Sequence, residues 1–117
     1  MKFILPLPLS VNATYGVTNK GRNGKARMYK TQLARDWEDA AMQQIIIQKG
    51  RQAKPKGDTV YVMFYRKDFR RWDSNNALKI LYDVLVKKQI IRDDSDLRFE
   101  QIQKIQSDKN YCVIEIL

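Results

Sequence analysis

The sequence contains no histidine and only one cysteine, Cys112. The absence of histidine excludes Ser-His catalytic triads, histidine metal ligands and histidine general bases. A metal ion would therefore be held by oxygen ligands, which favours Mg²⁺ or Mn²⁺ over zinc. One cysteine cannot form an intrachain disulfide, so we expect a reducing, cytoplasmic setting and a Cys112 that packs in the core among its apolar neighbours.

Acidic residues are few relative to basic ones. The chain has 13 Asp and Glu against 22 Lys and Arg, which gives a net charge of +9 at pH 7. Such an excess on 117 residues favours a polyanionic partner, with nucleic acid as the first candidate. No hydrophobic run approaches the roughly 18 apolar residues of a membrane span, and no helix combines a basic face with a bulky apolar one, so no membrane partner is expected.

Hydrophobic periodicity predicts an α+β fold in one domain over residues 1–117. The expected strands cover residues 2–7, 59–66, 98–106 and 110–116, and the expected helices cover residues 31–49 and 75–88. The order is therefore β-α-β-α-β-β, a small mixed sheet with two main helices. A core of this modest size would gain stability from a dimer.

Apolar spacing predicts which side of each element is buried. The first helix is expected to bury Leu33, Trp37, Ala40, Ala41 and Ile45, and the second is expected to bury Leu78, Leu81 and Leu85, flanked by Ile80 and Val84. In the strand over 59–66, Val60, Val62 and Phe64 share one face. Its other face is also bulky, so this strand is expected to be central or to lie against a partner.

A basic stretch that contains three glycines, residues 15–29, is predicted to be a loop. The basic side chains in and just after it are Lys20, Arg22, Lys25, Arg27 and Lys30. One interpretation is a solvated loop whose charges repel one another. The other, favoured by the rest of the chain, is a DNA-contacting arm that becomes ordered on binding.

Two acidic clusters stand out in this basic chain. Asp73 directly follows a basic segment, and Asp93, Asp94 and Asp96 follow the second predicted helix. Phosphodiester cleavage needs an activated water and neutralised phosphate charge, and Mg²⁺ held by carboxylates supplies both. The fold would have to bring the clusters together, which the sequence alone does not establish. The alternative is that Asp73 caps a helix and residues 93–96 form a turn.

Several basic and amide side chains surround these clusters. Lys79 shares a helix face with Asn75 and Asn76, where it would hold a phosphate or stabilise charge in the transition state, although spacing alone favours a solvated lysine. The residues expected to line the phosphate path before the first Asp include Lys67, Arg70 and Arg71. Trp72, between them and Asp73, is expected to pack in the core or an interface rather than on an opened base. DNA binding should weaken steeply with salt.

Three segments of the chain resemble the signature of the RusA family of Holliday junction resolvases. They are residues 71–79 followed by Asp83-Val84-Leu85, residues 90–95, and residues 5–12. The family pattern has a Pro-rich segment that ends in Ser-x-Asn, then Asp-x-Asp-Asn with a Lys three residues later, and finally an Asp-Asp pair. Found together and in this order, the three blocks are far more specific than any one of them.

The resemblance implies a homodimeric, structure-selective endodeoxyribonuclease that resolves four-way DNA junctions by paired nicks with Mg²⁺ or Mn²⁺. It also implies a phage or prophage source. Carried over from the family, the metal ligands are Asp73, position 75 and Asp94, with Asp93 as an adjacent candidate, and Lys79 supports activity. Asn76 matches the family's Asn and is counted among the DNA-binding residues.

One residue departs from the family pattern: position 75 is Asn where the family commonly has Asp. Asn offers a metal only a neutral oxygen and cannot act as a charged ligand or a base. The explanations are natural variation with a weaker or rearranged site, an engineered change that traps substrate, or a member that binds junctions without cutting them well. The alternative function is therefore a branched-DNA-binding module, and a weaker one is a nonspecific nuclease of linear DNA.

Overall fold

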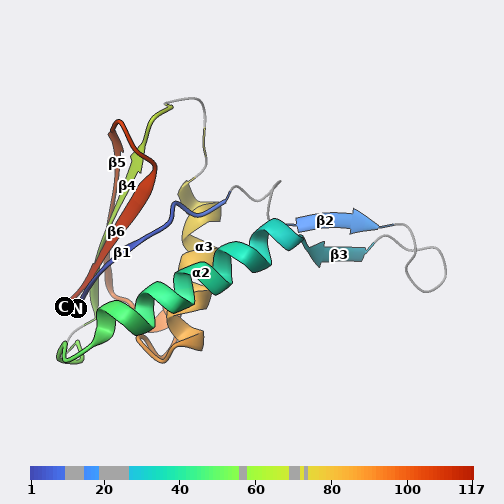
Figure 1. The fold of residues 1–117 in the computed structure, drawn as a ribbon. Coiled ribbons are helices and arrows are strands. Elements are labelled where there is room, and N and C mark those ends of the chain that lie inside the picture. The colour runs from blue at the N-terminus through green and yellow to red at the C-terminus, as the bar shows by residue number, and fades with distance from the viewer. Residues whose placement is uncertain (10–14, 19–26, 56–57, 69–71, 73) are drawn as a thin grey trace.

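The main body of the protein is a four-stranded sheet with two helices beside it (Figure 1). The computed structural model describes residues 1–9, 15–18, 27–55, 58–68, 72 and 74–117. The sheet strands are β1 (Lys2–Leu5), β4 (Thr59–Arg66), β5 (Phe99–Gln106) and β6 (Tyr111–Ile116). The helices are α2 (Gln32–Lys49) and α3 (Ser74–Lys87), and a short 3-10 turn, η2, covers Asp94–Asp96.

The strand order is β1-β6-β4-β5, with β4 and β5 parallel and the other pairs antiparallel. The predicted α+β class and β-α-β-α-β-β order of the main body are confirmed, and most predicted boundaries agree to within one residue. Strand β1 is shorter than expected because it ends at Leu5, before Pro6. As predicted, β4 is central and turns Val60, Val62 and Phe64 into the core.

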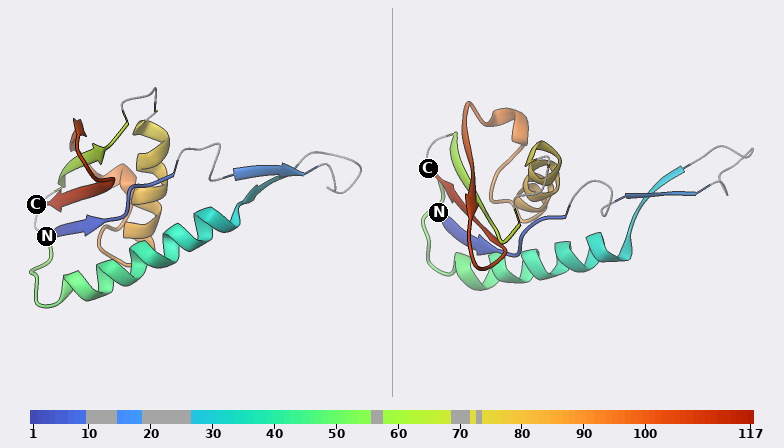
Figure 2. Two further views of the ribbon diagram at one scale, coloured as in Figure 1. Left: turned by 45° about the horizontal axis from the view of Figure 1, so that its top comes forward. Right: turned by 90° about the horizontal axis from the view of Figure 1, so that it is seen from above.

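Two further strands appear where a loop was predicted, over residues 15–29. Strands β2 (Tyr15–Thr18) and β3 (Arg27–Lys30) pair antiparallel as a separate two-stranded ribbon. Figures 1 and 2 show this ribbon projecting from the body. Strands of four residues are too short to show a clear period of two, and the glycines and basic residues of this stretch favoured a loop prediction. Lys20, Arg22 and Lys25 lie outside the described residues.

The core lies between the sheet and both helices. Phe3, Cys112 and Ile114 are fully buried on the inner side of the sheet, and every residue predicted for the buried stripe of α3 is buried. The prediction that Cys112 is a core residue is confirmed. On the opposite side of the sheet, the partly exposed Tyr65 stacks on its cross-strand neighbour Tyr111, with ring centroids 4.4 Å apart.

Helix α2 is rotated relative to the predicted stripe. Leu33 is 64% exposed and Ala40 is also exposed, so both predictions were wrong. The buried residues are Ala34, Trp37, Glu38, Ala41 and Ile45. This stripe has regular helical spacing, but the charged residue at its centre made it look like a polar face.

Helix α2 and the turn that follows it protect the outer edge of β1. The side-chain amide of Gln48 accepts from Ile4 N at 2.7 Å and donates to Ile4 O at 2.6 Å. Gln52 does the same for Lys2, accepting from its N at 2.8 Å and donating to its O at 3.1 Å. The two glutamines replace the missing neighbour strand and satisfy the edge. No helix in the described part of the chain has the length and apolar character needed to cross a bilayer.

The rotation of α2 predicts unequal effects for two adjacent isoleucines. Ile45 is 1% exposed, whereas Ile46 is 59% exposed. We expect Ile45→Ala to lower the free energy of unfolding by about 2–5 kcal/mol, because it removes buried methyl groups and leaves a cavity. Ile46→Ala should change it by about 0.5 kcal/mol or less. Urea unfolding of both variants measures the difference, and equal losses would refute the assigned helix face.

Candidate active site

The predicted site residues fall partly within the described part of the chain. Asn75, Lys79, Asp93 and Asp94 are described, and all four side chains are exposed. Asp73 lies outside it, immediately before the first residue of α3. Among the predicted DNA contacts, Lys67 is described and exposed. The others lie outside the described residues or have side chains that do, namely Lys20, Arg22, Lys25, Arg27, Arg70, Arg71 and Asn76.

One side of α3 faces away from the core and carries polar groups. Asn75, Lys79 and Asp83 follow one another at intervals of four residues, so they lie on the same side of the helix, one turn apart. Asn75 and Lys79 are exposed and Asp83 is half-buried. The predicted shared face of Asn75 and Lys79 is therefore present, and it extends to a carboxylate that sequence reasoning did not assign to the site.

The chain after α3 folds back against that helix. Ile90 N donates to Leu85 O at 2.9 Å, and Gln89 adopts a left-handed backbone with φ 58° that allows this reversal. Ile90 is buried and anchors the turn. The side chain of Asp93 then caps η2 by accepting from Ser95 N at 3.1 Å. The predicted turn at residues 93–95 is thus present, and it returns to the helix.

Asp94 reaches the neighbourhood of the second half of α3. Its negative charge raises the pKa of Tyr82, though less than burial and the hydrogen bond from Tyr82 to Glu100 (2.6 Å) do. The charge of Asp83 in turn contributes to the raised pKa of Asp94. At 1.5 Å per residue, Asp83 lies about 14 Å along the axis from Ser74. The chain reversal after α3 therefore brings Asp94 to the polar side of this helix. Asp73 lies outside the described residues.

The neighbouring carboxyl groups of Asp93 and Asp94 shift each other's pKa. A hydrogen bond between the two side chains lowers the pKa of Asp93, which also accepts from the backbone of Ser95. The same bond and the repulsion between the two charges raise the pKa of Asp94. Two carboxylates held this close repel each other, and a divalent cation would relieve that repulsion. The pair offers hard oxygen donors, the type that Mg²⁺ and Mn²⁺ prefer.

The described residues do not complete a metal site by themselves. Within the ranges that the structure covers, no three Asp, Glu, His or Cys side chains converge closely enough to hold an ion. The carboxylate oxygens of Asp93 and Asp94 are therefore the type of ligand that a hard cation prefers, and further ligands would have to come from other residues. Asp73 and Asn75, at the start of α3, are the candidates that the sequence offers.

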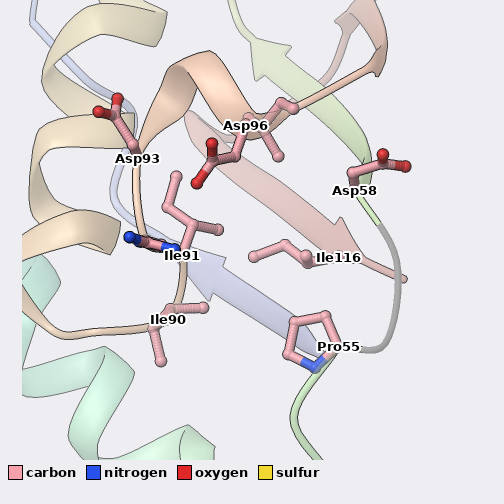
Figure 3. Close-up of a pocket in the computed structure, with 9 residues that line it drawn as sticks. Pro55, Asp58, Ile90, Ile91, Asp93, Asp96 and Ile116 are labelled. Carbon is pink, nitrogen blue, oxygen red and sulfur yellow. The ribbon is translucent and has the colours of Figure 1, made fainter.

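A hollow of about 230 Å³ lies beside the turn at residues 93–97 (Figure 3). Ile90, Ile91 and Ile116 line it, while Asp93, Asp96 and Asp58 lie around it. Asp58 is paired with Arg98 at 3.2 Å. Arg92 also lines the hollow, so its charge is mixed, and we assign it no part in DNA binding.

Trp72 fixes the chain just before Asp73. Its ring packs edge-on against the buried Phe64 at 4.8 Å between centroids, and the guanidinium of Arg66 lies 4.6 Å from the Trp72 ring. Lys104 on β5 donates from Nζ to the Trp72 carbonyl at 3.1 Å. The prediction that Trp72 packs rather than stacks on a base agrees with these contacts. Lys104 was missed because it comes from a strand 32 residues further along the chain.

Lys67 lies at the same end of β4 as Trp72. Its backbone N donates to the side chain of Asn110 at 2.8 Å, and Ser107 N donates to Arg66 O at 2.8 Å. These bonds tie the end of β4 to the β5–β6 turn and leave the Lys67 side chain exposed. Positive charge therefore lies close to the segment that leads into α3.

Comparison with known proteins shows which protein family the chain matches. Residues 10–117 match the family model described as "Endodeoxyribonuclease RusA". The match covers both acidic segments, the ribbon, both helices and strands β4, β5 and β6. A search of the curated proteins finds no match to the chain.

Proposed function

The chain belongs to the RusA family of metal-dependent endodeoxyribonucleases, which resolve Holliday junctions, and from this membership we propose how it cuts. We propose a twofold homodimer that makes paired nicks in four-way DNA with Mg²⁺ or Mn²⁺ as the ion. Two symmetric cuts need two active sites, and a twofold dimer supplies one for each cut strand. We also propose a reducing, cytoplasmic setting, in keeping with the buried, unpaired Cys112.

The observation that carries the site assignment is the Asp93–Asp94 pair beside the polar side of α3. Asp94, Asp73 and position 75 would hold the ion, with Asp93 next to them. When bound, the ion supplies an activated water and neutralises charge on the phosphate.

Lys79 is proposed to stabilise negative charge on the phosphate during cleavage. Its ammonium group is on the same side of α3 as Asp83, one turn away, and its side chain is exposed to a ligand. Lys79 and Asn75 lie in the first half of α3, where the helix dipole adds to the attraction for a phosphate. Lys67 and the basic residues that precede Asp73 would position the DNA backbone.

A second function is kept open by Asn75. With a neutral amide at a ligand position, the protein would bind branched DNA and cut it weakly or not at all. The two functions differ in one assay: a synthetic four-way junction incubated with and without Mg²⁺. Bound junction without nicked product supports the binding module.

The test of the proposed function compares the native chain with Asp73→Asn. We expect the native chain to nick the junction in the presence of Mg²⁺ and to leave a linear duplex of the same sequence largely intact. Asp73→Asn should lower the nicking rate by at least about 10-fold, because loss of a metal ligand exceeds the loss seen for outer partners. If the two proteins nick equally fast, the assignment of Asp73 is wrong.

A further inference from the structure

A buried carboxylate joins three elements at the base of the β2–β3 ribbon. Glu38 on α2 is 6% exposed. Its Oε1 accepts from Lys30 Nζ at 2.5 Å, and its Oε2 accepts from Lys87 Nζ at 3.1 Å. Lys30 is the last residue of β3, and Lys87 is the last residue of α3. One side chain therefore connects the ribbon, α2 and the helix of the candidate active site.

The charge of Glu38 is maintained by its partners. Burial by itself would raise the pKa of Glu38, but the hydrogen bonds from Lys30 and Lys87 and their positive charges outweigh burial and lower it. A carboxylate between two lysines leaves the cluster with a net positive charge. A simple stabilising contact would need only one lysine, and an apolar residue of similar size would fill the space as well. The second lysine adds a connection to α3.

The pairing of the ribbon strands is confined to the ribbon itself in the part of the chain that the structure describes. In the described part of the chain, β2 and β3 pair with each other and belong to no larger sheet. A lone two-stranded hairpin is marginally stable in water. Thr31 alone separates β3 from α2, and its Oγ1 accepts from Ala34 N at 3.2 Å as the helix cap. The ribbon thus continues directly into α2, and Lys30 folds back along the helix to Glu38.

We propose that Glu38 is a positioning residue that sets the direction of the basic ribbon relative to α3. The proposal rests on the proposed function, in which the ribbon and the active-site helix engage the same junction. Through Lys30, Glu38 holds the ribbon, and through Lys87 it holds α3. With both links intact, the ribbon strands and Lys79 on α3 would meet one DNA molecule in a fixed relation.

The first experiment measures junction binding by Glu38→Gln, a change that keeps the shape of the side chain and removes its charge. We expect the Kd for a four-way junction, measured without divalent metal, to rise about 10-fold, within the usual range for coupling between sites. The nicking rate at saturating junction should change less than the Kd, because Glu38 does not touch the reacting atoms. Asp39→Asn, which removes an exposed carboxylate from the next position of α2, is the matched control and should leave Kd unchanged.

A second experiment, in a variant that lacks basic ribbon residues, separates a positioning role of Glu38 from an effect on the stability of the fold. In a chain with Lys20→Gln, Arg22→Gln, Lys25→Gln and Arg27→Gln, residues 15–29 keep no basic side chain for Glu38 to position. Glu38→Gln should then have almost no further effect on Kd. An equal loss of binding in both backgrounds would mean that Glu38 only stabilises the fold, and would overturn the proposal. If Glu38→Gln fails to fold, Lys87→Met provides the same test at a lysine whose side chain is 49% exposed.

A measurement without DNA keeps the inference separate from the proposed function. Spin labels at Thr18→Cys on β2 and Val86→Cys on α3 report the distance between ribbon and helix. Cys112 is buried and does not compete for the label. We expect a narrow distance distribution that broadens or shifts with Glu38→Gln. An unchanged distribution would overturn the positioning role. A changed distribution in a protein that binds no junction would instead reject the proposed function and keep the role of Glu38.

Discussion

Asp94→Asn is expected to lower Mg²⁺-dependent nicking of a four-way junction by more than about 100-fold, because it removes a proposed charged metal ligand, and loss of an outer partner of a ligand alone costs about 10- to 100-fold. Binding of the junction without metal should be unchanged or tighter, since the substitution removes a negative charge that repels phosphate. The paired measurement is nicking rate at saturating junction and Kd in the presence of a chelator.

Asp96→Asn is the matched control for this experiment. Asp96 belongs to the same short turn and is equally exposed, and Figure 3 shows its carboxylate at the apolar hollow. Removing its charge changes the net charge of the protein by the same amount. We expect nearly native nicking from Asp96→Asn. Should both variants lose activity alike, the effect would come from the turn as a whole, and the assignment of Asp94 would fail.

Asn75→Asp is expected to raise Mg²⁺-dependent nicking by at least about 10-fold, with the largest gain at limiting metal. The substitution places a carboxylate at the proposed ligand position at the start of α3, on the same side of the helix as Lys79. A carboxylate in the first turn also interacts favourably with the helix dipole, so stability should not decrease. The measurement is the nicking rate as a function of Mg²⁺ concentration.

Asn75→Gln controls for the change of side chain without adding charge, and it should give no gain. Equal rates for Asn75→Asp and the native chain would mean that position 75 does not limit metal binding. Binding without nicking by both proteins would favour the branched-DNA-binding module. The outcome thus also decides between the two functions that Asn75 leaves open.

The main-body elements were predictable because their signals are local. The period of two in residues 59–66 and the apolar stripe of α3 agree with the structure, and Pro6 explains the early end of β1. The ribbon was missed because four-residue strands carry no clear period. The rotation of α2 was missed because Glu38 is a buried charge, and its partners Lys30 and Lys87 explain why burial is tolerated.

For the candidate site, the local structure around some of the predicted residues agrees with the sequence, while their roles stay predictions. The Asp93–Asp94 turn and the shared face of Asn75 and Lys79 follow from short sequence patterns. Asp83 could not be connected with Asp94 from the sequence, because the two carboxylates approach each other only when the chain folds back against α3. Lys104 and Trp72 meet across 32 residues of sequence, and no local pattern encodes that contact. Tertiary contacts of this kind determine where the ligand-bearing segments lie, and a single sequence does not reveal them.

The position of Cys112 has a practical consequence. Its thiol is fully buried on β6, which lies between β1 and β4, and its Sγ lies 3.6 Å from the carbonyl of Pro6. Burial raises the pKa of this thiol to about 12, so the reactive thiolate is scarce at neutral pH. A thiol reagent therefore modifies the native chain only when the core around Cys112 opens. Because the sequence has one cysteine, each modified molecule records one such opening, and the labelling rate measures how often the core beneath β6 becomes accessible.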